Sequence, residues 1–167
     1  MSVPQLIFLA GPNGAGKSTF FKAHLRELGM YFVNADEIVQ QAGIPNSEAA
    51  KAADALRAEL RQQKVSFITE TVFSDPVGAK VQFLRDAMAA GYHVRLIFIG
   101  LASLALSEAR VTMRVRDGGH DVPSDRLARR FAQSLKNLKA ALEFVPEAHV
   151  YDNSSSAEPF RSVLVLK

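Results

Sequence analysis

One segment near the N-terminus constrains the fold more than any other. Residues 6–20 read LIFLAGPNGAGKSTF, which is an apolar run typical of a buried strand, then a glycine-rich loop, then an amphipathic helix pattern. Residues 11–18 fit the pattern G-x-x-x-x-G-K-[ST] in the strand, loop and helix context that this pattern requires. Such a loop belongs to an open α/β sheet, so we expect parallel strands with helices on both faces.

The same loop predicts a site for a nucleoside triphosphate, ATP or GTP. Glycines let the backbone curl so that N–H groups point at phosphate oxygens, and the following helix adds its positive N-terminal dipole. The expected nucleotide contacts are Gly11, Pro12, Asn13, Gly14, Ala15, Gly16, Lys17, Ser18 and Thr19. Lys17 would reach the β- and γ-phosphates, the Ser18 hydroxyl would bind Mg²⁺, and Thr19 would lie near the α-phosphate.

Short β-rich runs alternate with helical patterns along the rest of the chain. Strands are predicted at residues 6–10, 31–33, 65–69, 94–99, 150–151 and 162–166, and helices at 17–28, 35–42, 47–63, 76–90, 103–116 and 124–144. Asp75 and Pro76 suit the cap and first residue of the fourth helix. The pattern predicts a three-layer P-loop NTPase-like α/β fold, with a mostly parallel central sheet of about five to six strands and a helical lid. We expect one domain over residues 1–167, with the lid hairpin at about 103–144.

The composition excludes several kinds of site. The chain has no cysteine, so it has no disulfide, thiol nucleophile or cysteine-ligated zinc, and a cytoplasmic location fits this usage. The four histidines lack i, i+4 pairing and read as surface or loop residues: His24, His93, His120 and His149. No apolar run suggests a membrane partner. A net charge of +3 without a basic stripe interleaved with aromatics does not favour nucleic acid.

Polar residues follow the second and third predicted strands, at the sheet edge where ligands bind in open α/β folds. In VNADEIV, Asn34 can cap the next helix, and Asp36 either favours the helix dipole or accepts the proton of an acceptor hydroxyl. In FITETVFSDP, Glu70 is either an exposed strand-end residue or a contact for Mg²⁺ or substrate, with Thr71 in the same polar turn.

Residues 114–130, RVRDGGHDVPSDRLARR, place five of the twelve arginines around a loop with two glycines and a proline. By itself this segment fits a solvated basic face with aspartate partners. Downstream of a phosphate loop it also fits a hinged lid, whose arginines neutralise charge on a transferring phosphoryl group and exclude water.

Taken in order, the segments GPNGAGKST, NADEI, ETVFS, RVRDGGHDVPSDRLARRF, SLKNL and YDNS resemble the zeta toxin-like P-loop kinases, including small bacterial proteins described as predicted ABC-type ATPases. The resemblance covers roughly residues 6–153. It implies a kinase for a hydroxyl of a UDP-activated amino sugar, typically UDP-N-acetylglucosamine, with Mg²⁺-ATP or GTP as donor. It also implies an antitoxin-like protein as a binding partner.

The resemblance also implies roles for individual residues. Lys17 and Asp36 would be catalytic, with Asp36 as the base, and Ser18 and Glu70 would hold the metal. Substrate would contact Asp36, Glu70 and Thr71.

For the lid, the resemblance implies that Arg116 and Arg129 are catalytic and contact the donor phosphates. Arg114 and Arg130 are close enough in sequence to exchange roles with them. Asn153, which follows the fifth predicted strand, would touch the adenine.

Two other functions share the phosphate loop and remain open at this point. One is an ATPase or switch module that acts through a protein partner. The other is a kinase for a nucleoside or for a nucleic-acid end, although the chain lacks the aromatic and basic platform that single strands need.

Overall fold

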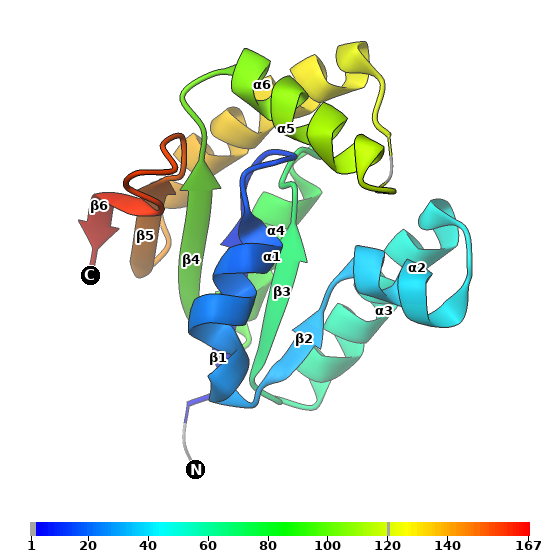
Figure 1. The fold of residues 1–167 in the computed structure, drawn as a ribbon. Coiled ribbons are helices and arrows are strands. Elements are labelled where there is room, and N and C mark those ends of the chain that lie inside the picture. The colour runs from blue at the N-terminus through cyan, green and yellow to red at the C-terminus, as the bar shows by residue number, and fades with distance from the viewer. Residues whose placement is uncertain (1–2, 120) are drawn as a thin grey trace.

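The computed structural model describes residues 3–119 and 121–167, so His120 lies outside the described residues. Within them, one sheet has the strand order β2-β3-β1-β4-β5-β6 (Figure 1). The strands are β1 Gln5–Ala10, β2 Tyr31–Val33, β3 Phe67–Thr71, β4 His93–Gly100, β5 Glu147–Asp152 and β6 Arg161–Leu166. Neighbouring strands pair in parallel from β2 to β5, and only β6 runs antiparallel, to β5. The predicted, mostly parallel sheet is therefore confirmed.

The helices follow the predicted order with two corrections. They are α1 Lys17–Phe20, the π-helix η1 Phe21–Leu25, the 3-10 helix η2 Arg26–Leu28, α2 Ala35–Ala42, α3 Asn46–Gln62, α4 Ala79–Ala89, α5 Leu104–Arg116 and α6 Ser124–Leu142. The helix expected at 17–28 is thus three helical segments in succession. None of the helices in the described part of the chain combines the length and apolarity needed to cross a membrane.

The start of α4 is the second correction. The pair Asp75 and Pro76 was expected to begin this helix, but Pro76 lies in a turn and α4 begins at Ala79. Gly78 precedes the helix with a left-handed φ of 75°, a backbone conformation that interrupts helical continuation from Pro76. The Asp75 carboxylate still accepts a hydrogen bond from Lys80 N at 3.3 Å, so it stabilises the first turn of α4 although it lies four residues before the helix begins.

Alternating residues of β1 divide the core into two layers. Leu6 and Phe8 pack with residues of α3, α4 and α6, whereas Ile7 and Leu9 pack with residues of α1 and η1. The helices therefore cover both faces of the sheet, as expected. Figure 1 shows α5 and α6 lying across the carboxyl ends of the strands, which is where the phosphate loop leaves β1.

Candidate active site

The phosphate loop, residues 11–18, needs glycine at two positions. Gly11 has φ +149°, and a Cβ there would lie 2.2 Å from the carbonyl oxygen of Ile99 in β4. Gly16 has φ +92° and forms the left-handed N-cap of α1, where a Cβ would lie 2.6 Å from Asn153 Nδ2. The glycines thus allow the loop to curl tightly between two neighbouring segments of the sheet edge.

Lys17 lies folded back over this loop. Its Nζ donates hydrogen bonds to the carbonyl oxygens of Gly11 at 2.9 Å and Pro12 at 3.1 Å. Burial lowers the pKa of Lys17, while the nearby carboxylates of Glu70 and Asp36 act in the opposite direction. The ammonium group therefore sits in the loop among opposite charges, the position from which such a lysine approaches β- and γ-phosphates.

Ser18 and Glu70 form a hydroxyl–carboxylate pair beside Lys17. Ser18 Oγ lies 3.3 Å from both carboxylate oxygens of Glu70, and Asn34 Nδ2 donates to Glu70 Oε2 at 3.2 Å. Glu70 is 8% exposed, and burial raises its pKa, while the charge of Lys17 lowers it. A hydroxyl and a single carboxylate are oxygen donors of the kind that hold Mg²⁺ together with substrate phosphates and water, so these residues fit that ion. No group of three or more acidic, histidine or cysteine residues in the described ranges is placed to hold a metal by itself.

Strand pairing explains why Glu70 is buried. Glu70 and Thr71 were expected after the third strand, but they lie inside β3, opposite Leu9 and Ala10 of β1. Pairing with β1 carries the strand two residues beyond the apolar run. Thr71 Oγ1 accepts a hydrogen bond from Phe73 N at 3.1 Å, so this hydroxyl supports the turn after β3.

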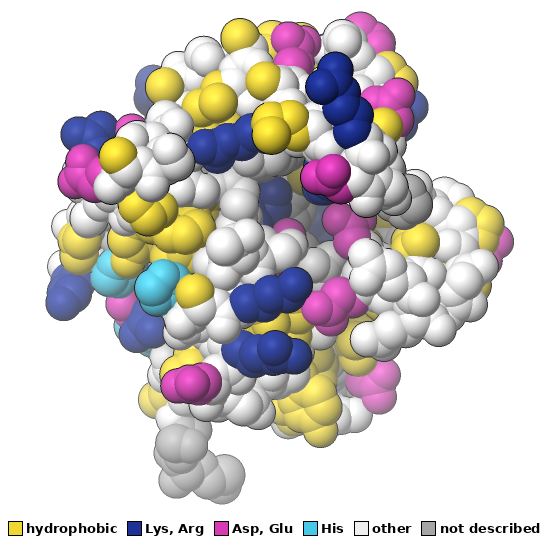
Figure 2. All heavy atoms as spheres, in the orientation of Figure 1, with side chains coloured by type: hydrophobic (Ala, Val, Ile, Leu, Met, Phe, Trp, Pro, Cys, Tyr) yellow, Lys and Arg dark blue, Asp and Glu magenta, His cyan; other side chains and the backbone are white. Residues whose placement is uncertain are grey.

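Asp36 lies in the first turn of α2 and is exposed to solvent. The predicted cap is confirmed, because Asn34 Oδ1 accepts from Asp36 N at 2.9 Å. The charge of Asp36 affects the pKa of Lys17, Glu70 and Arg130, so its carboxylate lies within electrostatic reach of these groups. Figure 2 shows acidic and basic side chains inside a hollow beneath the helices that cross the sheet edge.

The four candidate lid arginines are not equivalent. Arg114 and Arg130 are the arginines whose charges lower the pKa of Lys17. Arg129 is exposed and pairs with Asp125 at 2.9 Å, one turn earlier on α6, and Arg116 is exposed at the end of α5. Arg114 is as exposed as Arg116, so what distinguishes Arg114 and Arg130 from the expected pair Arg116 and Arg129 is the effect of their charges on the pKa of Lys17.

The expected lid hairpin is tied to the core by its α5 arm. Ser107 Oγ donates to the Asn13 carbonyl at 2.6 Å. Arg110 donates to the carbonyls of Gly14 and Ser154, both at 3.4 Å. These contacts fix the first two turns of α5 against the phosphate loop and the segment after β5.

The α6 arm is tied to the turn after β3. The buried side chain of Asn137 donates to the carbonyls of Phe73 and Asp75, both at 3.0 Å. Phe73 has a left-handed φ of 62°, which is strained for a residue with a bulky side chain. Among the described residues, no such hydrogen bond joins the tip of the hairpin, residues 114–126, to the core.

Arg57 is a buried contact that the sequence motifs do not single out. Its Nε donates to Thr69 Oγ1 at 2.6 Å and its Nη2 to the Glu70 carbonyl at 3.3 Å. Thr69 Oγ1 in turn donates to the Val33 carbonyl at 3.2 Å. Arg57 thus joins α3 to the ends of β2 and β3. Glu70 lies in β3, and Asp36 lies in α2, which follows β2. The position of Arg57 on the buried helix face of Ala49 and Ala53 is the one sequence signal for this role.

Asn153, the residue expected to contact the adenine, hydrogen-bonds to the phosphate loop. Its Nδ2 donates to the Ala15 carbonyl at 2.9 Å, and its Oδ1 accepts from Phe160 N at 3.3 Å. The side-chain amide is therefore engaged with the loop and the segment before β6, so any contact with a base would have to share these hydrogen bonds.

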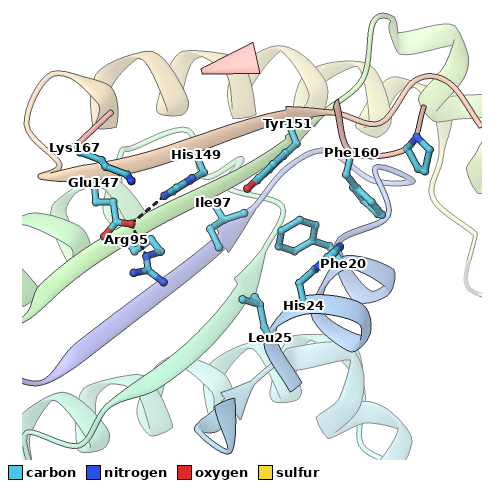
Figure 3. A pocket seen from close by; sticks show the side chains of 11 residues that line it. Phe20, His24, Leu25, Arg95, Ile97, Glu147, His149, Tyr151, Phe160 and Lys167 are labelled. Carbon is cyan, nitrogen blue, oxygen red and sulfur yellow. Dashed lines mark hydrogen bonds and ion pairs between the residues drawn. The ribbon is translucent and has the colours of Figure 1, made fainter. Parts of the chain in front are cut away.

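A separate cavity of about 650 Å³ lies on the sheet face beside η1 (Figure 3), and neither Lys17 nor Asp36 lines it. Its polar end is organised around the Glu147 carboxylate, with Arg95 Nε at 2.7 Å, His93 Nε2 at 2.8 Å and His149 Nε2 at 2.9 Å. These groups lower the pKa of Glu147 to about 2 against the cost of burial. The carboxylate is fully engaged, so this cluster contributes to stability between β4 and β5.

The phosphate loop on β1, the parallel sheet and the two helices across its carboxyl edge define the P-loop kinase fold. A shikimate kinase from Bacteroides thetaiotaomicron shares it with a TM-score of 0.50 at 20% identity, over 89% of this chain and 85% of that chain. The chain belongs to the zeta toxin family, whose model matches residues 2–164.

Further similarities agree with this assignment. A structure from the PezAT toxin–antitoxin system of Streptococcus pneumoniae superimposes with a TM-score of 0.69 at 19% identity, over 99% of this chain and 72% of that chain. AvrRxo1-ORF1 in complex with AvrRxo1-ORF2 and ATP gives 0.72 at 19% identity, over 91% of this chain and 55% of that chain. An uncharacterized protein of Haemophilus influenzae is 28% identical over 126 residues, which are 72% of this chain and 88% of that protein.

Proposed function

We propose that the protein is a kinase that transfers the γ-phosphoryl group of ATP or GTP to a hydroxyl of a small molecule, and that the acceptor is a UDP-amino sugar such as UDP-N-acetylglucosamine. The observation that supports the proposal most is the Ser18–Glu70 pair beside Lys17, whose pKa is also affected by the charges of Asp36, Arg114 and Arg130. Phosphoryl transfer needs these parts: phosphate ligands, a metal site, a base and cations over the phosphates.

In the proposed reaction the phosphate loop and Lys17 hold the donor phosphates. Mg²⁺, when bound by Ser18 and Glu70, would neutralise charge on the β- and γ-phosphates. Asp36 accepts the proton of the acceptor hydroxyl as the oxygen bonds to the γ-phosphorus. The bond from that phosphorus to the β-γ bridging oxygen breaks, and ADP or GDP leaves with this oxygen.

The two arginines are proposed to act as the lid closes. Arg114 and Arg130 already lie within electrostatic reach of Lys17, so a small movement of the α5–α6 hairpin would bring them onto the phosphates. Replacing Arg114 or Arg130 with alanine should lower the transfer rate by about 10³-fold or more. The matched changes Arg116→Ala and Arg129→Ala should have little effect on the transfer rate. A larger loss of rate in these two variants would instead identify Arg116 and Arg129 as the arginines that contact the phosphates.

The experiment that tests the proposal is a transfer assay with γ-labelled ATP and Mg²⁺ against a panel of UDP-sugars, nucleosides and small alcohols. A labelled UDP-amino sugar supports the proposal in full. A labelled nucleoside or alcohol supports a kinase and overturns the acceptor. Label released only as inorganic phosphate overturns the kinase assignment and favours an ATPase.

An antitoxin-like protein partner and a cytoplasmic location complete the proposal. The PezAT structure comes from a toxin–antitoxin system, and the AvrRxo1 structure is a complex of two proteins. Both support the proposal that this protein also has a protein partner. A partner-dependent ATPase is the alternative, and it predicts hydrolysis that rises when the partner is added, without any phosphorylated acceptor.

A further inference from the structure

The sheet-face cavity beside η1 is not used in the proposed phosphoryl transfer. Its volume of about 650 Å³ lies within the range of about 300–1,000 Å³ that is usual for small-molecule sites. Residues of β4 and β5 form its base, and residues of α1, η1 and the segment before β6 form its walls (Figure 3). The cavity has an aromatic part and a cationic part, which together define the ligand that would fit.

The aromatic part lies against the end of α1. The Phe20 ring lies 5.2 Å from the Tyr151 ring and 5.2 Å from the Phe160 ring, measured between centroids. Ile97 of β4 and Leu25 of η1 complete this part, and both are buried. Aromatic rings attract a further ring in offset or edge-to-face geometry, so these walls suit a flat aromatic group.

The cationic part lies at the other end, where Arg95 and Lys167 line the cavity. Glu147 is the one acid among the described residues that line it, and both of its oxygens are engaged by Arg95, His93 and His149. In the hydrogen bonds of the described residues Arg95 uses only its Nε, and its side chain is 38% exposed, which leaves both Nη groups for a ligand. Two cations against one engaged carboxylate favour an anionic group at this end.

The walls of the cavity are joined to the phosphate loop. Phe160 N donates to Asn153 Oδ1 at 3.3 Å, and Asn153 Nδ2 donates to the Ala15 carbonyl at 2.9 Å. Phe20 N donates to the Gly16 carbonyl at 2.9 Å. A ligand that holds the Phe20 and Phe160 rings would therefore also restrict the loop. A loop that is already ordered loses less conformational freedom when nucleotide binds.

We propose that this cavity is an effector site for a small, flat aromatic anion, and that binding of the effector tightens the binding of nucleotide. The ring of the effector lies among Phe20, Tyr151 and Phe160. Its anionic group lies at Arg95 and Lys167. The site is separate from the groups proposed to transfer phosphate, so this inference goes beyond the proposed function and does not depend on which acceptor is phosphorylated.

The probe is 8-anilinonaphthalene-1-sulfonate, an aromatic anion whose fluorescence rises when it binds an apolar site. The matched neutral probe is N-phenyl-1-naphthylamine, which has the same rings without the sulfonate. The phosphate loop is first filled with a non-hydrolysable ATP analogue and Mg²⁺, so that the anion cannot occupy the phosphate site.

The anionic probe should then bind saturably to the unchanged protein. The variant Lys167→Gln, which leaves the hydrogen bonds of Glu147 intact, should bind the anionic probe about threefold more weakly. The double variant Arg95→Gln/Lys167→Gln should bind it about tenfold more weakly, a difference of about 1.4 kcal/mol. The affinity for the neutral probe should stay the same in both variants. Lys51→Gln, an exposed change on α3 outside the cavity, should bind both probes as the unchanged protein does.

The effector role is tested by titrating ADP with and without a saturating amount of the anionic probe. The probe should raise the affinity for ADP about fivefold or more in the unchanged protein, and it should leave the double variant unaffected. Unchanged or weaker ADP binding in the presence of the probe would overturn the effector role.

Equal affinity of the double variant and the unchanged protein for the anionic probe would overturn the site, and so would an equal loss of both probes. Probe binding that disappears as the protein forms dimers at higher concentration would overturn it in favour of an interface between two copies. The assay needs no phosphoryl transfer, so its failure leaves the proposed kinase activity untouched.

Discussion

Replacing Arg57 with methionine removes the buried guanidinium that joins α3 to the ends of β2 and β3. Arg57 is 5% exposed, and two of its hydrogen bonds are to buried groups, at 2.6 Å and 3.3 Å. A hydrogen bond from a charged group contributes about 1.5–3 kcal/mol, and the longer bond contributes less. The Asp54 partner is 58% exposed, so losing that ion pair changes little. Relief of the guanidinium's desolvation offsets part of the loss, so we expect a destabilisation of about 1–3 kcal/mol.

For a chain of this length, about 1–3 kcal/mol corresponds to a fall in Tm of roughly 2–12 °C, which thermal unfolding followed by circular dichroism will measure. The matched control is Arg61→Met, on the same helix, which removes a 3.5 Å pair with Asp86 and should shift Tm by less than about 2 °C. Transfer activity should also fall in Arg57→Met, because the end of β3, which carries Glu70, and the end of β2, which precedes Asp36, lose their support. Equal Tm values for the two variants would refute the role assigned to Arg57.

Two further changes probe the loop and the sheet. Gly11→Ala places a Cβ 2.2 Å from the Ile99 carbonyl oxygen and should abolish nucleotide binding in calorimetry. In Gly100→Ala the added Cβ lies 3.5 Å from the Tyr151 carbonyl oxygen, an ordinary contact distance, so this variant should bind nucleotide normally; binding by Gly11→Ala would contradict the loop geometry. Because the pKa of Glu147 is lowered to about 2, its stabilisation is present above the unfolded value of 4.5 and is lost as the pH falls through about 2. Urea unfolding at several pH values should show that Glu147→Gln loses less stability on acidification than the unchanged protein does, and parallel pH curves would refute the cluster's contribution.

The fold and the phosphate loop could be predicted because their signals are local. The glycine pattern and the apolar runs lie within a few residues of one another, and the positions of Gly11 and Lys17 follow from that pattern. The Asn34 cap is local in the same way, since its acceptor and donor are two residues apart.

The remaining contacts depend on packing between distant segments. Arg57 reaches Thr69 across twelve residues, and Asn137 reaches Phe73 across 64, and no local pattern encodes either pair. The choice between Arg114 and Arg116 has the same origin. Residues two apart on an α-helix point about 200° apart, so only one of them faces the cleft, and the packing of α5 decides which.

The central claim is that Asp36 is the base of a phosphoryl-transfer site. The most direct test is to measure nucleotide affinity and the single-turnover rate of transfer side by side for Asp36→Asn, with the exposed Glu27→Gln as control. The account predicts nearly unchanged nucleotide affinity and a transfer rate lower by about 10²–10⁴-fold in Asp36→Asn, with both quantities unchanged in Glu27→Gln. An Asp36→Asn protein that transfers phosphate at the full rate would contradict it.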